Sequence, residues 1–228
     1  MRSLLLIALV GCEHGQTPPG SDGSLSDGGT TGCLPDLLIE GELIDWDSSD
    51  AAFQGVFGAT LTQVGNPSVT LTTAPNGRLS LCAGRADPFL FTVAAGADDH
   101  LSGTLTIEPN VVLGAFRPLS FRTLTPARAA TFFDEQGLTF DPDAAQIVVL
   151  QTGDRAELTL SGTHDPAQAG DDSTGAITWS AGAGGRYVLF PNVTPGANVQ
   201  LAGDPLGPRP ILAVAGEVSL VAINFVLE

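Results

Sequence analysis

Hydrophobic residues recur at every second position over many short stretches of this chain, which is the periodicity of a β-strand with one buried face. In residues 58–64, for example, Leu61 and Thr62 fall on opposite sides of the expected strand. Gly, Pro, Asn and Asp punctuate these stretches at intervals of about 8–12 residues, as in β-sandwiches. The pattern predicts strands at 37–44, 58–64, 68–73, 78–82, 89–94, 146–151, 156–161, 175–179, 186–190, 198–202, 210–215 and 218–227.

Two local signals add detail to this pattern. Asn76-Gly77 is typical of the two-residue turn of a β-hairpin, so residues 68–73 and 78–82 are expected to form one. Thr125 suits a helix N-cap, Pro126 suits the first helical position and Gly137 suits the end, so the sequence predicts a short helix near 127–136.

Composition agrees with a chain of strands and turns. Of 228 residues, 28 are Gly and 16 are Pro, while charged residues make up 15% and aromatic residues 6%. We therefore predict an all-β protein with two small antiparallel β-sandwich modules joined by a short helical connector. The modules are expected at residues 34–108 and 145–228, with the connector at residues 109–144.

A weak internal repeat relates the two predicted modules. Residues 76–81 (NGRLSL) match residues 184–189 (GGRYVL), and each places Gly-Arg before an alternating strand. With the turn at 192–196 (NVTPG), these motifs resemble carboxypeptidase regulatory-like domains. The resemblance implies prealbumin-like sandwiches with accessory or adhesive roles and no catalytic residue. The first copy departs from the pattern because it lacks the Pro-Gly turn.

The charge of the chain excludes several classes of function. The formal net charge is −16, and all nine basic residues are arginines. Such a surface repels nucleic acids and anionic lipid headgroups, so we expect no nucleic-acid partner. The absence of lysine also excludes Schiff-base chemistry, a Walker A lysine and a Ser–Lys dyad.

The first twelve residues have the layout of an export signal. A positive start at Met1–Ser3 precedes the apolar run Leu4–Val10, which is too short to span a bilayer. The sequence LVGC ending at Cys12 resembles the bacterial lipobox. This resemblance implies a signal peptide at residues 1–11, cleavage before Cys12 and a lipid on the Cys12 sulfur. The alternative is an ordinary secreted protein in which Cys12 is incidental.

The segment after Cys12 supports an anchored protein. Residues 13–32 are rich in Gly, Ser, Thr and Pro and contain a single Leu, so they cannot bury a core. About twenty such residues reach roughly 25 Å on average, which suits a tether. We therefore assign residues 12–33 to the lipidated Cys and a flexible linker. The expected location is the bacterial cell envelope, on its periplasmic or cell-surface side.

Three cysteines are present: Cys12, Cys33 and Cys82. If Cys12 carries a lipid, Cys33 and Cys82 form the one intramolecular disulfide pair that remains, and an exported compartment permits it. Two free, buried thiols are the alternative.

A search for catalytic motifs finds few candidates. The histidines are His14, His100 and His164, and neither a Gly-x-Ser-x-Gly elbow nor a His-Glu-x-x-His motif occurs. Tyr187 is the single tyrosine, which excludes the paired-tyrosine iron site of intradiol dioxygenases, whose sandwich is related. Residues 161–165 (SGTHD) hold triad residue types, but such close neighbours rarely converge. We predict no enzyme activity and no cofactor.

Two acidic loops and two tryptophans leave alternatives open. Residues 45–50 (DWDSSD) and the group of His164, Asp165, Asp171 and Asp172 could each hold Ca²⁺, although solvated loops explain them better and we predict no metal site. Exposed Trp46 and Trp179 could stack on sugar rings, but core packing is the preferred interpretation.

The function predicted from these features is that of a non-enzymatic, lipid-anchored envelope protein. Its partners are the membrane, through the lipid, and an unknown envelope protein or glycan. The alternative is a carbohydrate-binding or adhesive module, with Ca²⁺ assisting. A surface hydrolase that uses Asp171 or His164 is a third possibility.

Overall fold

The computed structural model describes residues 37–49, 52–83, 89–94, 96, 99–107, 119–172, 177–203 and 207–225. All of them belong to one structural unit, Thr31–Glu228. The described elements are fifteen strands and one helix, so the predicted all-β class is confirmed. They are β1 (Leu37–Asp45), β2 (Thr60–Gln63), β3 (Thr70–Thr72), β4 (Arg78–Ala83), β5 (Phe89–Ala94), β6 (Gly103–Ile107), β7 (Leu119–Thr123), α2 (Pro126–Glu135), β8 (Ala145–Gly153), β9 (Thr159–Leu160), β10 (Gln168–Asp171), β11 (Thr178–Ala181), β12 (Tyr187–Val193), β13 (Gly196–Ala202), β14 (Arg209–Ala213) and β15 (Val218–Phe225).

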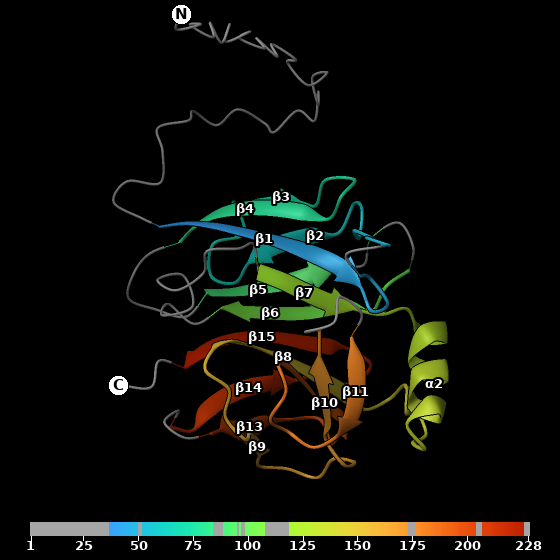
Figure 1. Ribbon diagram of the computed structural model, residues 1–228. Helices are drawn as coiled ribbons and strands as arrows, with labels where there is room; N and C mark the ends of the chain where they lie inside the picture. Colours follow the sequence, from blue (N-terminus) through green and yellow to red (C-terminus); the bar gives the residue numbers. More distant parts are fainter. Residues whose placement is uncertain are drawn as a thin grey trace, which may run out of the picture. The chain divides into compact units, whose positions relative to one another are not determined.

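One long sheet runs through both halves of the chain (Figure 1). Its nine strands follow the order β11-β10-β12-β8-β15-β6-β5-β2-β3. The last strand, β15, lies between β8 and β6 and runs parallel to both. The two halves of the chain are therefore joined by backbone hydrogen bonds through β15. The module boundaries expected near residues 108 and 145 remain a prediction.

Side-chain alternation divides the core into two clusters on opposite faces of this sheet. Val148, Leu150 and Leu220 belong to the first cluster, with residues of β1, β7 and α2. Val149 and Val221 belong to the second, with residues of β9, β13 and β14. The sheet β4-β1-β7 thus packs on one face of the long sheet, and the sheet β14-β13-β9 packs on the other.

The parallel pairings differ from the expected all-antiparallel modules. β1 also runs parallel to β7, which belongs to the segment predicted as the connector. Strands covered on both faces read as continuous apolar runs rather than alternating ones. β15 is a strand of this kind, since its residues from Val218 to Ile223 are all buried.

Helix α2 confirms the predicted helix, with its limits shifted by one residue. Thr125 is the N-cap, and its Oγ1 accepts a hydrogen bond of 3.2 Å from the backbone N–H of Arg128. Gly137 follows with φ = +69°, a conformation that favours glycine. The buried face of the helix carries Ala129, Phe132 and Phe133.

Asn76-Gly77 forms a turn, but the predicted hairpin is wrong. β3 pairs with β2, whereas β4 pairs with β1 in another sheet, so the turn carries the chain from one sheet to the next. Gly77 has φ = +72°, and a Cβ there would lie 2.1 Å from the carbonyl oxygen of Leu43. Glycine is therefore required by close packing as well as by the turn.

Three strands were not anticipated from the sequence: β6, β7 and β10. β10 (QAGD) has no large apolar residue, and β7 (LSFRT) places an arginine in a buried strand. Hydrophobic alternation cannot detect a strand such as β10, whereas β6 (GTLTI) and β7 (LSFRT) do alternate but offer only two large apolar positions each.

We expect Gly103→Ala to destabilise the protein strongly. A Cβ at Gly103 would lie 1.8 Å from the carbonyl oxygen of Val218, so the substitution would force β6 away from β15. The expected loss is about 3 kcal/mol of unfolding free energy, measured by urea denaturation. Gly196→Ala is the matched control in a strand, because a Cβ there meets nothing within 4 Å. Equal midpoints for the two variants would contradict this account of the β6–β15 junction.

Candidate functional site

Of the three cysteines singled out from the sequence, only the backbone of Cys82 lies within the described residues. Cys12 and Cys33 lie outside the described residues. The backbone of Cys82 lies in β4 opposite Leu38 of β1, but its side chain is also outside the described part. The lipidation of Cys12 and the Cys33–Cys82 disulfide therefore stay predictions.

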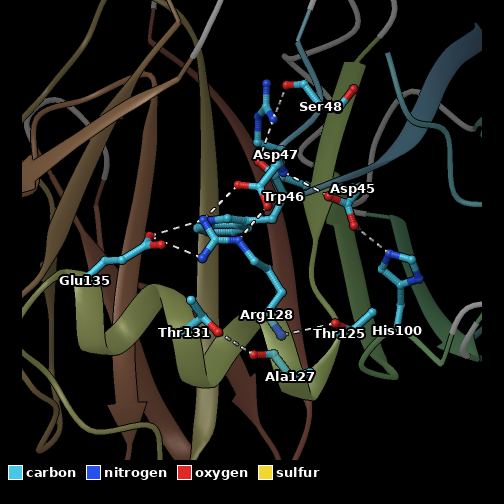
Figure 2. A network of polar contacts seen from close by, with 11 residues as sticks. Asp45, Trp46, Asp47, Ser48, His100, Thr125, Ala127, Arg128, Thr131 and Glu135 are labelled. Carbon is cyan, nitrogen blue, oxygen red and sulfur yellow. Dashed lines mark hydrogen bonds and ion pairs between the residues drawn. The ribbon is translucent and has the colours of Figure 1, made fainter. Parts of the chain in front are cut away.

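The first acidic loop begins at the end of β1, and the carboxylates of Asp45 and Asp47 contact arginine, histidine and backbone groups (Figure 2), while Asp50 lies outside the described residues. Asp45 Oδ2 lies 3.1 Å from His100 Nε2, and Asp45 Oδ1 accepts a hydrogen bond from the backbone N–H of Asp47. The hydrogen bond with His100 lowers the pKa of Asp45 from its usual 3.8, and burial opposes this effect. Ser48 Oγ accepts from the backbone N–H of Gln54 at 2.9 Å.

Arg128 of α2 connects the helix to this loop. Its Nε and Nη2 donate to the two carboxylate oxygens of Asp47 at 2.5 and 2.8 Å, a bidentate geometry that only arginine provides. It also donates to Glu135 at 3.2 Å. The hydrogen bond to Asp47 raises the pKa of Arg128. Figure 2 shows this guanidinium between the two carboxylates.

The second acidic group is divided among separate partners. Asp172 pairs with Arg186 at 2.6 Å, and Asp171 pairs with Arg155 at 2.8 Å. Asp165 accepts a hydrogen bond of 2.6 Å from Asn192, so it belongs to a different network. Within the described ranges, no three His, Cys, Asp or Glu residues are placed to hold a metal ion.

The catalytic residue types near Ser161 do not form a dyad. The Oγ of Ser161 accepts a hydrogen bond from the backbone N–H of Gln200 at 2.8 Å. The Nδ1 of His164 lies 2.6 Å from the carbonyl oxygen of Asp165, and its ring packs edge-on against Phe190. Both side chains thus make local structural contacts.

The two tryptophans come together in an aromatic cluster. Their rings stack with centroids 4.7 Å apart and an interplanar angle of 8°, and Phe132 of α2 meets both rings edge-on. Trp46 is 1% exposed, which confirms that it packs in the core. Its ring is therefore not available to stack on a sugar ring. Trp179 is half-buried and lies over Gly170, its cross-strand partner, where a Cβ would approach the indole to 3.0 Å.

Sequence reasoning missed Arg122, a buried cation beside this cluster. Its Nη1 donates to the carbonyl oxygens of Trp46 and Ser48 at 2.9 and 2.7 Å, and its guanidinium lies 5.2 Å from the ring centroid of Tyr187. Burial raises the pKa of Tyr187, and the nearby arginines oppose that rise. The sequence gives no signal for its burial, because Arg122 occupies a polar position in the alternating stretch LSFRT.

In the part of the chain that is described, no helix is both long and apolar enough to cross a membrane. No known protein family matches the sequence, and no curated protein matches it.

Several solved structures match the fold weakly. The Bacillus anthracis TIE protein has a TM-score of 0.27 at 10% identity, with 84% of this chain and 34% of that chain covered. A streptococcal ancillary pilin has a TM-score of 0.25 at 10% identity, with 84% and 63% covered. The major pilin of Streptococcus pyogenes has a TM-score of 0.21 at 7% identity, with 83% and 99% covered. This chain spans about a third of the TIE protein and less than two thirds of the ancillary pilin. Because these scores are low, no function is transferred from them.

We expect Trp46→Ala to cost about 3–5 kcal/mol of unfolding free energy, because it leaves a cavity between Trp179 and Phe132. The measurement is urea denaturation followed by circular dichroism. Phe57→Ala serves as the control, because Phe57 is 50% exposed and its loss should cost about 0.5 kcal/mol or less. Similar costs for the two substitutions would contradict the role given to the stack.

The Asp45–His100 contact predicts a specific pH dependence. Because the pKa of Asp45 is lowered in the folded state, its carboxylate contributes stability that is complete above the ordinary value of 3.8. That contribution is lost as the pH falls through the folded-state pKa. Asp45→Asn should therefore destabilise the protein more at pH 7 than at about pH 3, measured by urea midpoints. Asp134→Asn, on the exposed face of α2, should show no such difference.

Proposed function

We propose that this chain is a non-enzymatic lipoprotein of a bacterial cell envelope, whose β domain mediates interactions with an envelope protein or glycan. The observation that carries the proposal is the order of segments before β1. A signal-like run ends at Cys12 in a lipobox-like sequence, and a core-free linker follows before the domain begins.

The physics of lipid anchoring fits this order. Each buried CH₂ group contributes about 0.8 kcal/mol, so one acyl chain holds a protein only marginally, whereas several chains hold it firmly. The formal charge of −16 opposes direct contact between the folded domain and anionic headgroups. A linker that keeps the domain away from the surface reconciles an anchored chain with an acidic domain.

The non-enzymatic part of the proposal is supported by what the candidate residues contact. His100 is bound to Asp45, His164 packs on Phe190, and Ser161 accepts from Gln200. The carbohydrate-binding alternative depends on exposed tryptophans, and its Ca²⁺-assisted form depends on free carboxylates. Trp46 is buried, and Asp47 and Asp172 pair with arginines. An interaction role through the folded surface is therefore favoured over an aromatic sugar platform.

Mass spectrometry of the mature N-terminus tests the anchor. We expect a first residue of Cys12 that carries added lipid mass, and a protein that partitions with membranes. Cys12→Ser is the control, because it removes the sulfur that accepts the lipid while leaving the apolar run intact. An N-terminus cut elsewhere, or a wild-type protein without lipid mass, would overturn the proposal.

A further inference from the structure

Besides Nδ1 of His100 and Oγ1 of Thr123, three buried side-chain N–H groups that can only donate have no acceptor among the described residues. They are Nε1 of Trp46, Nε1 of Trp179 and Nε of Arg122. Indole and guanidinium N–H groups can only donate, so each of them needs an acceptor. Buried polar groups are almost always paired, and an unpaired one calls for a specific physical reason.

The three donors belong to residues that are linked through shared neighbours. The rings of Trp46 and Trp179 stack on each other, and Arg122 is bonded to the carbonyl oxygen of Trp46. Gly170 pairs with Trp179 on one side and with Tyr187 on the other, and the Arg122 guanidinium lies over the Tyr187 ring. Strands β7, β10, β11 and β12 and the loop after β1 thus all contribute to this place.

The charge of Arg122 sets this group apart from the other buried polar residues. Arg122 is 4% exposed, and its described contacts are two carbonyl oxygens and the ring and hydroxyl of Tyr187, without a carboxylate. Arg186 lies 5.7 Å from the centroid of the same ring but pairs with Asp172. A buried cation without a counter-ion is costly, and an added negative charge would remove that cost.

We propose that Arg122, Trp46 and Trp179 form a binding site for a small oxyanion, in the form of a carboxylate or phosphate group. Such a group supplies the acceptor oxygens that three obligate donors need and a negative charge, which the described contacts of Arg122 do not include. The three donor atoms are buried, and Trp179, which is half-buried on the edge strand β11, is the most exposed of the three residues, so an anion would enter from that side. This site is independent of the proposed lipid anchor.

Titration of the purified chain with acetate and with inorganic phosphate tests the site. The protein has two tryptophans and both lie in the site, so intrinsic fluorescence reports on it directly. We expect one of the two anions to give a saturable change in fluorescence and a rise in melting temperature. Sodium chloride at matched ionic strength is the control. A response to neither anion, or an equal response to chloride, would overturn the proposal.

Variants locate the binding within the site. Arg122→Lys keeps the charge but removes the Nε donor, and the anion should bind at least about tenfold more weakly. Arg186→Lys is the matched control, because Arg186 covers the same ring but already has a carboxylate partner, and its affinity should be unchanged. Trp179→Phe keeps the ring contact and removes one donor, so it provides the same test if Arg122→Lys does not fold. Unchanged affinity in Trp179→Phe, or equal losses in the two arginine variants, would contradict the assignment.

Discussion

The insertion of β15 between β6 and β8 is the contact on which the architecture depends. It joins strands from the two halves of the chain into one sheet, and β15 contributes side chains to both core clusters. The close approach of Gly103 to Val218 shows how little space the junction has. Non-local parallel pairing of this kind carries a large loop-closure cost, which the burial of an almost wholly apolar strand offsets.

The second constraint is the junction at the end of β1, where three parts of the chain meet. Trp46 from the first half stacks on Trp179 from the second, and Phe132 of the intervening helix contacts both. Arg128 adds a bidentate contact from the helix to Asp47. Aromatic rings are suited to this task because they bury a large area with few rotatable bonds.

The arginines of this lysine-free chain make contacts for which lysine is less suited, because a guanidinium is planar, carries five N–H donors and stacks on aromatic rings. Four of them, Arg122, Arg128, Arg155 and Arg186, lie against carboxylates, carbonyl oxygens or aromatic rings. The contacts of Arg128, Arg155 and Arg186 neutralise local negative charge in a protein with a large acidic excess. The described carboxylates of the two acidic loops contact arginine, histidine or asparagine side chains.

The sequence by itself determined the strand rhythm, the helix after Thr125, the all-β class and the expectation of an exported, anchored chain. These features depend on local periodicity, capping and composition, which neighbouring residues decide. Only the tertiary structure decided the place of β15, the pairing of Trp46 with Trp179 and the burial of Arg122. Residues 46, 122 and 179 are far apart in the chain, and their contacts depend on which strands become neighbours, which the local pattern does not specify. For the same reason the sequence does not reveal β10: its residues, none of them large and apolar, form a strand because of the strands on either side.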